Sequence, residues 1–165
     1  KASVLGDYVA SKLEMEEGEV PLFMTVTVDY RGYMLFFYQN GKCAKIPLAS
    51  YMTKQNRRKL LKAYSDKEEL AAMLHIEEET ELAVFTSGGT GGPRLILVGS
   101  ALIPEKATRD TAGINMVTLK KNARIAKVRP AAGLELKDPH RYRVRTLPAA
   151  GALLRQEDTT EQMSL

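Results

Sequence analysis

Residues 33–48 decide the fold class. They read YMLFFY (33–38), QNG (39–41) and KCAKIPL (42–48). The first run is rich in aromatic and other β-forming side chains, and the last run alternates polar and apolar residues. Asn40-Gly41 between two such runs is the strongest short hairpin signal, because both residues accept positive φ. The stretch therefore predicts an antiparallel hairpin.

Runs of the same kind occur on both sides of this hairpin. Upstream, Pro21 to Asp29 is rich in Phe, Val and Thr, ends at an Arg31-Gly32 turn, and predicts a further strand. Downstream, four β-like runs follow at 81–86 (ELAVFT), 94–99 (RLILVG), 113–119 (GINMVTL) and 123–129 (ARIAKVR). The arginines of 141–145 (RYRVR) would share one face of another strand. An all-β chain is expected.

Local rules conflict over residues 65–76. Ser65 followed by Glu68 forms a capping box ahead of an apolar run, which predicts a helix. The alternative is a strand over 70–76, and periodicity does not decide for a run this short.

An internal repeat resolves that conflict. Residues 35–37 match 83–85 at a spacing of 48, and 44–50 match 94–100 at a spacing of 50. A basic loop and then an apolar run follow each copy, at 71–75 in the first and at 115–119 in the second. Repeats of roughly 40–50 residues with about four short strands are typical of propeller blades. Residues 70–75 therefore occupy a strand position, and the chain supplies about two full blades with pieces of neighbours.

Composition sets the class of protein. The chain has 165 residues, 44% of them hydrophobic, with 24 basic and 20 acidic residues and a net charge of +4. A single cysteine, Cys43, excludes a disulfide framework and a four-cysteine zinc site. No apolar run approaches the roughly 20 residues of a membrane span, and no signal peptide opens the chain, so a soluble cytosolic protein is expected. The first residue is Lys1 rather than Met, which suggests a fragment.

No catalytic constellation is found in the sequence. His75 and His140 lack metal-ligand spacing with other residues, and Cys43 is interpreted as a core residue. The Gly-rich stretch 87–92 (SGGTGG) lacks the Gly-Lys-Ser/Thr ending of a phosphate loop and is interpreted as a linker.

Basic residues cluster in the connections between the β runs. The residues in these clusters are Lys54, Arg57, Arg58, Lys59, Lys62, Lys106, Arg109, Lys120, Lys121 and Arg124, which are either ordinary solvated loop residues or a candidate binding surface for a polyanion. The first basic connection carries the basic residues of 54–62, and the second carries Lys106 and Arg109. Because the two occupy equivalent positions in the repeat, they would lie side by side and form a band, with Arg57, Arg58, Lys59 and Arg109 exposed. Such a band suits a bent polyanion, because phosphate contact releases counterions and needs no base readout. A protein-interaction module is the alternative, and it predicts an exposed apolar patch instead.

The segments 32–37, 41–48, 56–60 and 63–67 together resemble the C-terminal region of the DNA-cleaving subunit of bacterial type II topoisomerases, that of DNA gyrase or topoisomerase IV. Residues 100–104 and 108–113 resemble the same region in a second copy. The resemblance covers about residues 20–130. It implies a β-pinwheel, a propeller-like ring of blades around whose basic rim DNA bends. Two features differ: the chain is too short for five or six blades, and it lacks the Gln-Arg-Arg-Gly-Gly-Lys-Gly box of gyrases, which favours a topoisomerase IV-like or divergent subunit.

The resemblance leads to a set of expectations. Residues 1–19 form a connector, 20–130 the pinwheel blades and 131–165 an irregular or short helical C-terminal tail. The chain itself is expected to be non-catalytic and without cofactor, since the cleavage tyrosine would lie upstream and ATP and Mg²⁺ would serve only the parent enzyme. Expected partners are double-stranded DNA, the ATPase subunit, and the rest of the DNA-cleaving subunit, with no membrane, in the bacterial cytoplasm at the nucleoid. Gyrase and topoisomerase IV are not distinguished, nor is the number of blades in the parent.

Overall fold

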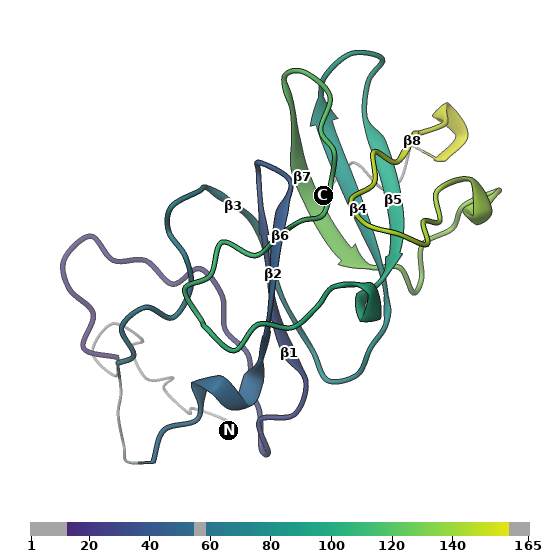
Figure 1. The fold of residues 1–165 in the computed structure, drawn as a ribbon. Coiled ribbons are helices and arrows are strands. Elements are labelled where there is room, and N and C mark those ends of the chain that lie inside the picture. Colours follow the sequence, from purple (N-terminus) through teal and green to yellow (C-terminus); the bar gives the residue numbers. More distant parts are fainter. Residues whose placement is uncertain (1–12, 55–58, 159–165) are drawn as a thin grey trace, which may run out of the picture.

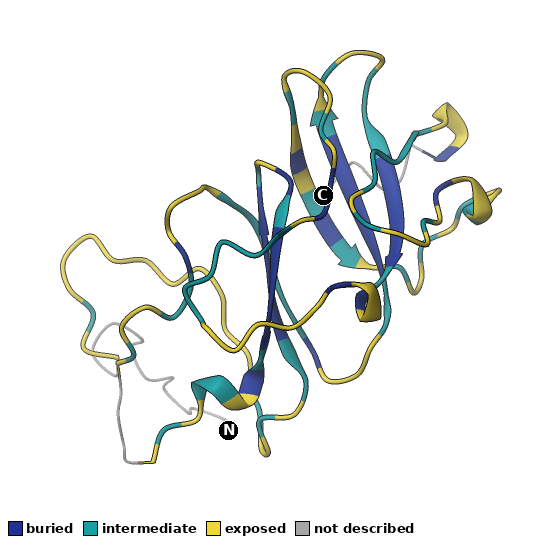
Figure 2. Ribbon diagram, viewed as in Figure 1, coloured by how far each residue is buried: buried dark blue, intermediate teal, exposed yellow. Residues whose placement is uncertain are grey.

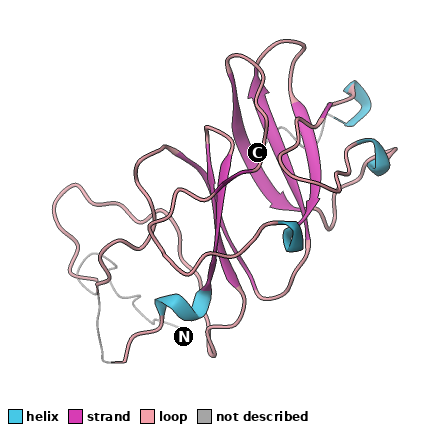
Figure 3. Ribbon diagram, in the orientation of Figure 1, coloured by secondary structure: helices cyan, strands magenta, loops and turns pink. Residues whose placement is uncertain are grey.

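Two four-stranded antiparallel sheets pack face to face in the computed structural model, which describes residues 13–54 and 59–158 (Figure 1). The first sheet has the order β3 (Leu70–Ile76), β1 (Tyr33–Tyr38), β2 (Lys42–Pro47), β6 (Ile114–Asn115). The second has the order β7 (Ala123–Pro130), β4 (Glu81–Gly88), β5 (Arg94–Gly99), β8 (Ala152–Leu153). Four short 3₁₀ helices follow strands or loops: η1 (Leu48–Tyr51), η2 (Ser100–Leu102), η3 (Pro139–Arg141) and η4 (Gln156–Asp158) (Figure 3). The predicted all-β class is confirmed.

The hairpin of β1 and β2 forms where the sequence predicts it. Tyr33 pairs with Pro47 and Phe37 with Cys43, and the amide of Gly41 donates to the carbonyl of Tyr38 over 3.0 Å. Gly41 has a φ of +94°, whereas Asn40 does not have a positive φ. The connection is therefore a three-residue turn with one left-handed glycine, and not the two-residue turn in which both central residues are left-handed.

The two sheets are copies of one unit, and the first takes its fourth strand, β6, from the chain between β5 and β7 of the second. β3 pairs with β1 as β7 pairs with β4, and β6 pairs with β2 as β8 pairs with β5. The capping box at 65–68 thus does not start a helix, and 70–76 is a strand as the repeat predicts. The counterpart of β3 is β7, so the predicted match of 71–75 with 115–119 is wrong. Residues 114–115 instead return to the first sheet (Figure 1).

The repeat spacing changes within the hairpin. Tyr33 and Glu81 occupy the same place at a spacing of 48, whereas Pro47 and Gly99 do so at a spacing of 52. The predicted spacing of 50 for the second strand is therefore two residues short. Of the four additional residues, two lengthen β4 to eight residues against six for β1, and two lie in the Gly-rich loop between β4 and β5.

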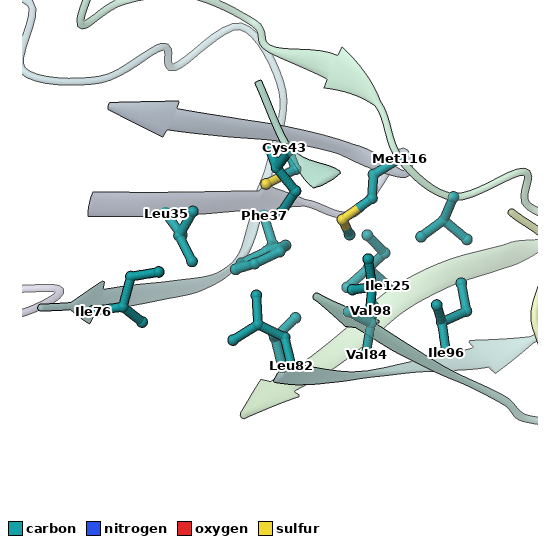
Figure 4. Packing of buried hydrophobic residues seen from close by; sticks show 13 residues of the cluster. Leu35, Phe37, Cys43, Ile76, Leu82, Val84, Ile96, Val98, Met116 and Ile125 are labelled. Carbon is teal, nitrogen blue, oxygen red and sulfur yellow. The ribbon is translucent and has the colours of Figure 1, made fainter. Parts of the chain in front are cut away.

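The main core lies between the two sheets (Figure 4). Leu35, Phe37 and Cys43 from the first sheet meet Leu82 and Val84 from the second, all at most 1% exposed. Alternation in the strands dictates this arrangement, because every second side chain faces the neighbouring sheet. The even-numbered residues of β1, such as Met34 and Phe36, belong to a second cluster on the outer face of the first sheet.

The outer face of the second sheet is covered by the C-terminal part of the chain. Tyr142 is 1% exposed and packs with Phe85 and Leu97 in a third cluster. Its hydroxyl donates to the Asp158 carboxylate over 2.6 Å and accepts from the Arg155 amide over 3.1 Å.

Two segments predicted to be strands are not strands. Residues 21–29 lie along the first sheet without regular pairing, and 141–145 begin in η3 and continue as loop, with a single bridge from Arg143 to Leu97. Both runs have β-forming composition, but a strand also requires a neighbouring strand in register.

Candidate nucleic-acid interface

The lysines of the first basic connection are exposed, but they differ in whether carboxylates already pair with them. Lys54, Lys59 and Lys62 are exposed, whereas Arg57 and Arg58 lie outside the described residues. The Lys59 ammonium lies 3.2 Å from the Glu16 carboxylate and 3.8 Å from that of Glu19. A hydrogen bond to Glu16 and the charges of both carboxylates raise the pKa of Lys59. Phosphate would have to compete with these carboxylates for Lys59.

Arg109 joins the two basic connections. The side chain is half-buried, where exposure was expected, and its guanidinium donates to the Ser50 carbonyl over 2.9 Å. It also lies 6.0 Å from the centre of the Tyr51 ring. Burial raises the pKa of Tyr51, against the opposing charge of Arg109. Arg109 therefore holds the second connection against η1, at the start of the first connection. Lys106 remains exposed beside it.

A third basic group surrounds the turn before β7. Lys120, Lys121 and Arg124 are all exposed. The turn that leads into β7 is largely yellow, the colour of exposed residues, in Figure 2. Arg124 stands opposite Ser87 in the β4–β7 pairing, and Gly88 stands opposite Ala123. This group therefore lies beside the Gly-rich loop that joins β4 to β5.

The acidic residues of the second sheet lie at the end of the sheet opposite to this basic group. The turn between β3 and β4 carries Glu77, Glu78 and Glu79, and Glu81 begins β4. Seven steps along β4 separate Glu81 from Gly88, which is roughly 23 Å at about 3.3 Å per residue. This exceeds the screening length of about 8 Å at physiological salt, so these carboxylates do not neutralise the basic turn.

The acidic turn has its own partners. Glu77 pairs with Arg31 at 2.9 Å and Glu81 with Arg143 at 2.7 Å. Glu79 pairs with Lys45 at 2.5 Å, and the Ser100 hydroxyl also donates to Glu79. Burial acts to raise the pKa of Glu79, but the hydrogen bonds from Lys45 and Ser100 outweigh it, so that pKa lies below its usual value.

Lys45 is a buried cation that the sequence analysis did not single out. It is 3% exposed, donates to the Ser100 carbonyl over 3.1 Å, and lies 4.3 Å from the centre of the Tyr33 ring. Its counterpart in the second repeat is Leu97, since Lys45 bridges to Glu105 as Leu97 bridges to Arg143. Comparison of the two repeats in the correct register is the signal that would have exposed it.

The residues considered for catalysis have structural roles. Cys43 is in the core, and burial raises the pKa of its thiol. The His75 ring is satisfied by the Thr25 hydroxyl at 2.8 Å and the Arg31 carbonyl at 3.2 Å. His140 lies in η3. Within residues 13–54 and 59–158, no group of three or more metal-ligating side chains comes together, and no helix is long and apolar enough to cross a membrane.

An apolar groove of about 510 Å³ runs along the outer face of the first sheet. Phe23, Tyr30 and Phe36 are among its lining residues. The adjoining segment exposes further apolar side chains: Met24 is 71%, Val26 83% and Val28 98% exposed, and Leu22, which also lines the groove, is 61% exposed. This is the kind of surface that the protein-interaction alternative predicts.

No protein-family model matches the sequence, and no curated protein matches it. Solved structures do match this chain in fold. The crystal structure titled as the C-terminal domain of DNA topoisomerase IV superposes with a TM-score of 0.67 at 16% identity, over 90% of this chain and 49% of that one. The structure of the DNA gyrase A C-terminal domain superposes with a TM-score of 0.64 at 14% identity, over 90% of this chain and 53% of that one. The chain spans about half the length of these domains, and its two sheets, linked by the crossing strand β6, have the fold of a β-pinwheel fragment, as the sequence resemblance implies.

Proposed function

We propose that this chain belongs to the C-terminal region of the DNA-cleaving subunit of a type II topoisomerase and binds and bends double-stranded DNA without catalysis of its own. The observation that carries the proposal is the superposition on the topoisomerase IV and gyrase A domains over 90% of the chain. In the parent enzyme, the rest of the DNA-cleaving subunit would supply cleavage, and the ATPase subunit would supply ATP hydrolysis with Mg²⁺. Such a protein would act in the bacterial cytoplasm at the nucleoid.

The surface charge supports phosphate contact. Lys54, Lys62, Lys106, Lys120, Lys121 and Arg124 are exposed side chains in loops or at strand ends. Of the other described candidates, Lys59 is held by carboxylates and Arg109 by a backbone carbonyl, so these two contribute less direct contact. Lysines on loops contact phosphates without reading base edges, so binding would be independent of sequence.

The salt dependence of binding tests the proposal. Labelled duplexes of two unrelated sequences are titrated with the 165-residue chain between 50 and 200 mM salt, and affinity is measured by fluorescence anisotropy. Each phosphate contact on duplex DNA contributes about 0.9 to the slope of log affinity against log salt, so four to six contacts give a slope of roughly −4 to −5 for both sequences. Absence of binding at 50 mM salt would reject the proposal.

The second candidate function is a protein-interaction module, which the apolar groove favours. The repeat offers a different explanation for this surface. Met34 and Phe36 correspond to Leu82 and Val84, which pack against a neighbouring sheet. The outer face of the first sheet is therefore of the type that accepts another pinwheel unit. Replacement of Leu22 and Phe23 by Ser separates the two functions, since both side chains line the groove and are exposed, and their replacement leaves the basic loops and the buried core intact.

A further inference from the structure

A hollow of about 270 Å³ lies between the loop that joins β4 to β5 and the turn that precedes β7. Gly89 and Thr90 line it from the loop, and Lys121 and Asn122 line it from the turn. Both segments lie together at the top of Figure 1, beyond the ends of the strands. A water molecule takes up about 30 Å³ in the liquid, so the hollow has room for a hydrated anion.

The glycines of the loop are required for this arrangement. A Cβ on Gly88 would lie 2.4 Å from the Asn122 carbonyl oxygen, and a Cβ on Gly89 would lie 2.9 Å from the Ala123 Cβ. Both glycines also have positive φ, at +71° and +78°. No other residue fits there without displacing the turn. The equivalent connection in the first sheet is the tight turn at Gly41, which is two residues shorter and follows a strand two residues shorter, so the hollow belongs to the second repeat.

Hydrogen-bond donors surround the hollow. The amides of Gly89, Thr90 and Gly91 donate no backbone hydrogen bond within the described part of the chain, whereas the Gly92 amide closes the turn at residues 90–91. Gly91 and Gly92 continue the left-handed conformation, with φ of +88° and +100°. Successive amides in such conformations form concavities that bind anions. The Thr90 hydroxyl and the side chains of Lys121 and Asn122 add further donors.

The charge around the hollow is positive. Lys120 and Arg124 are exposed next to it, and none of its lining residues is acidic. The carboxylates of the same sheet lie at the other end of β4, which is farther from the hollow than the screening length at physiological salt.

We propose that this hollow binds a phosphate group through the amides of the Gly-rich loop, Thr90, Lys121 and Asn122. This inference rests on the proposed function: the bound group is a phosphodiester of the DNA backbone, held at one fixed point of the basic surface. Free inorganic phosphate has the same chemistry and is the other possible source of the anion.

The test combines a lysine variant with an amide readout on the 165-residue chain. Lys121→Ala removes one cation that lines the hollow, and Lys67→Ala removes one exposed cation from a distant turn. Duplex affinity is measured against salt for both variants. The backbone amide resonances of residues 89–92 are followed by NMR while a duplex, and separately inorganic phosphate, is added.

Lys121→Ala is expected to weaken duplex binding about three- to tenfold and to flatten the salt slope by about 0.9, with little change for Lys67→Ala. The amides of residues 89–92 are expected to shift with the duplex at lower concentration than with phosphate. If the chain binds DNA but both lysine variants behave alike and these amides do not move, the inference is overturned and the proposed function stands. If the chain does not bind DNA, the proposed function fails. Phosphate-induced shifts of these amides then support an anion site with a free phosphate as its ligand, and their absence overturns that site as well.

Discussion

The buried ion pair between Lys45 and Glu79 gives the sharpest test of the packing between the two sheets. The two side chains differ in burial: the Lys45 side chain is 4% exposed and that of Glu79 is 39% exposed. Loss of the charge on one partner therefore has a different consequence from loss of the charge on the other.

Glu79→Gln leaves a buried ammonium without its counter-charge. Removal of one partner from a fully buried pair costs about 3–5 kcal/mol. Here the Ser100 carbonyl and the Tyr33 ring still contact the ammonium, so we expect about 2–3 kcal/mol.

Lys45→Met keeps the unbranched stem and removes the charge. The Glu79 carboxylate can then be hydrated, because it is partly exposed, and replacement of a buried ion by an apolar side chain of similar volume is often neutral. Leu97, the counterpart of Lys45, shows that an apolar residue fits this position in the repeat. We expect a loss of less than about 1 kcal/mol, including the lost contact with the Tyr33 ring.

Urea unfolding of the two single variants and of the double variant forms a complete cycle. The double variant should be more stable than Glu79→Gln alone, because no buried ammonium is left without a partner. The reasoning is refuted if Lys45→Met destabilises as much as Glu79→Gln and the two effects add.

The remaining predictions concern acid stability, a close backbone approach, the C-terminal cover and the buried thiol. Because the folded-state pKa of Glu79 is lowered, its contribution to stability is complete above its ordinary value of 4.5 and is lost as the pH falls through the folded pKa; in Glu79→Gln the acid limb of a stability-against-pH curve should be shallower. Gly113→Ala places a Cβ 2.0 Å from the Cys43 carbonyl oxygen at a φ of +79°, so it should cost at least about 2 kcal/mol in urea unfolding and expose the β6–β2 amides to hydrogen exchange. Gly18→Ala shares the left-handed strain, at a φ of +86°, but has no atom within 4 Å of its Cβ, so it should cost less, and the difference measures the clash with the Cys43 carbonyl. Tyr142→Phe leaves the buried Asp158 carboxylate without one of its donors and should cost about 1.5–3 kcal/mol, with faster proteolysis after residue 131; unchanged proteolysis would contradict this role. Cys43 should not react with an aromatic disulfide reagent at pH 8 until the protein unfolds, because burial raises the pKa of its thiol; rapid reaction of the native protein would contradict this packing.

The strands were predictable from the sequence where local preference and burial agree. Residues 33–48 and 81–99 combine β-forming side chains with turn residues and are buried on both faces. Residues 21–29 have the same composition but remain outside the sheets, because strand formation depends on a partner that no local pattern specifies.

The sequence indicates where most of the candidate basic residues lie, but not which of them are already paired within the fold. Sequence clustering placed the basic residues on connections, and the described ones do lie there except Arg124, which lies near the start of β7. Whether a cation is free depends on distant groups: Glu16 lies 43 positions from Lys59, and Ser50 lies 59 positions from Arg109. No local rule links such pairs, so the same cluster contains exposed lysines and cations that the fold already uses.

The register of the repeat explains both the success and the error of the sequence alignment. A spacing of 50 was predicted for the second hairpin strand, and the structure gives 52. Because side chains alternate with a period of two, this error leaves every residue on its correct face, whereas an error of one would have exchanged core and surface. The two repeats therefore share their buried positions and differ in the connection between the hairpin strands. Of the four added residues, two extend β4, where Ser87 and Gly88 pair with β7, and the other two lengthen the loop, which lies next to Lys121 and Asn122. A loop that the core does not need, at a position where the repeats differ, is where a binding site can be added without cost to the packing of the strands.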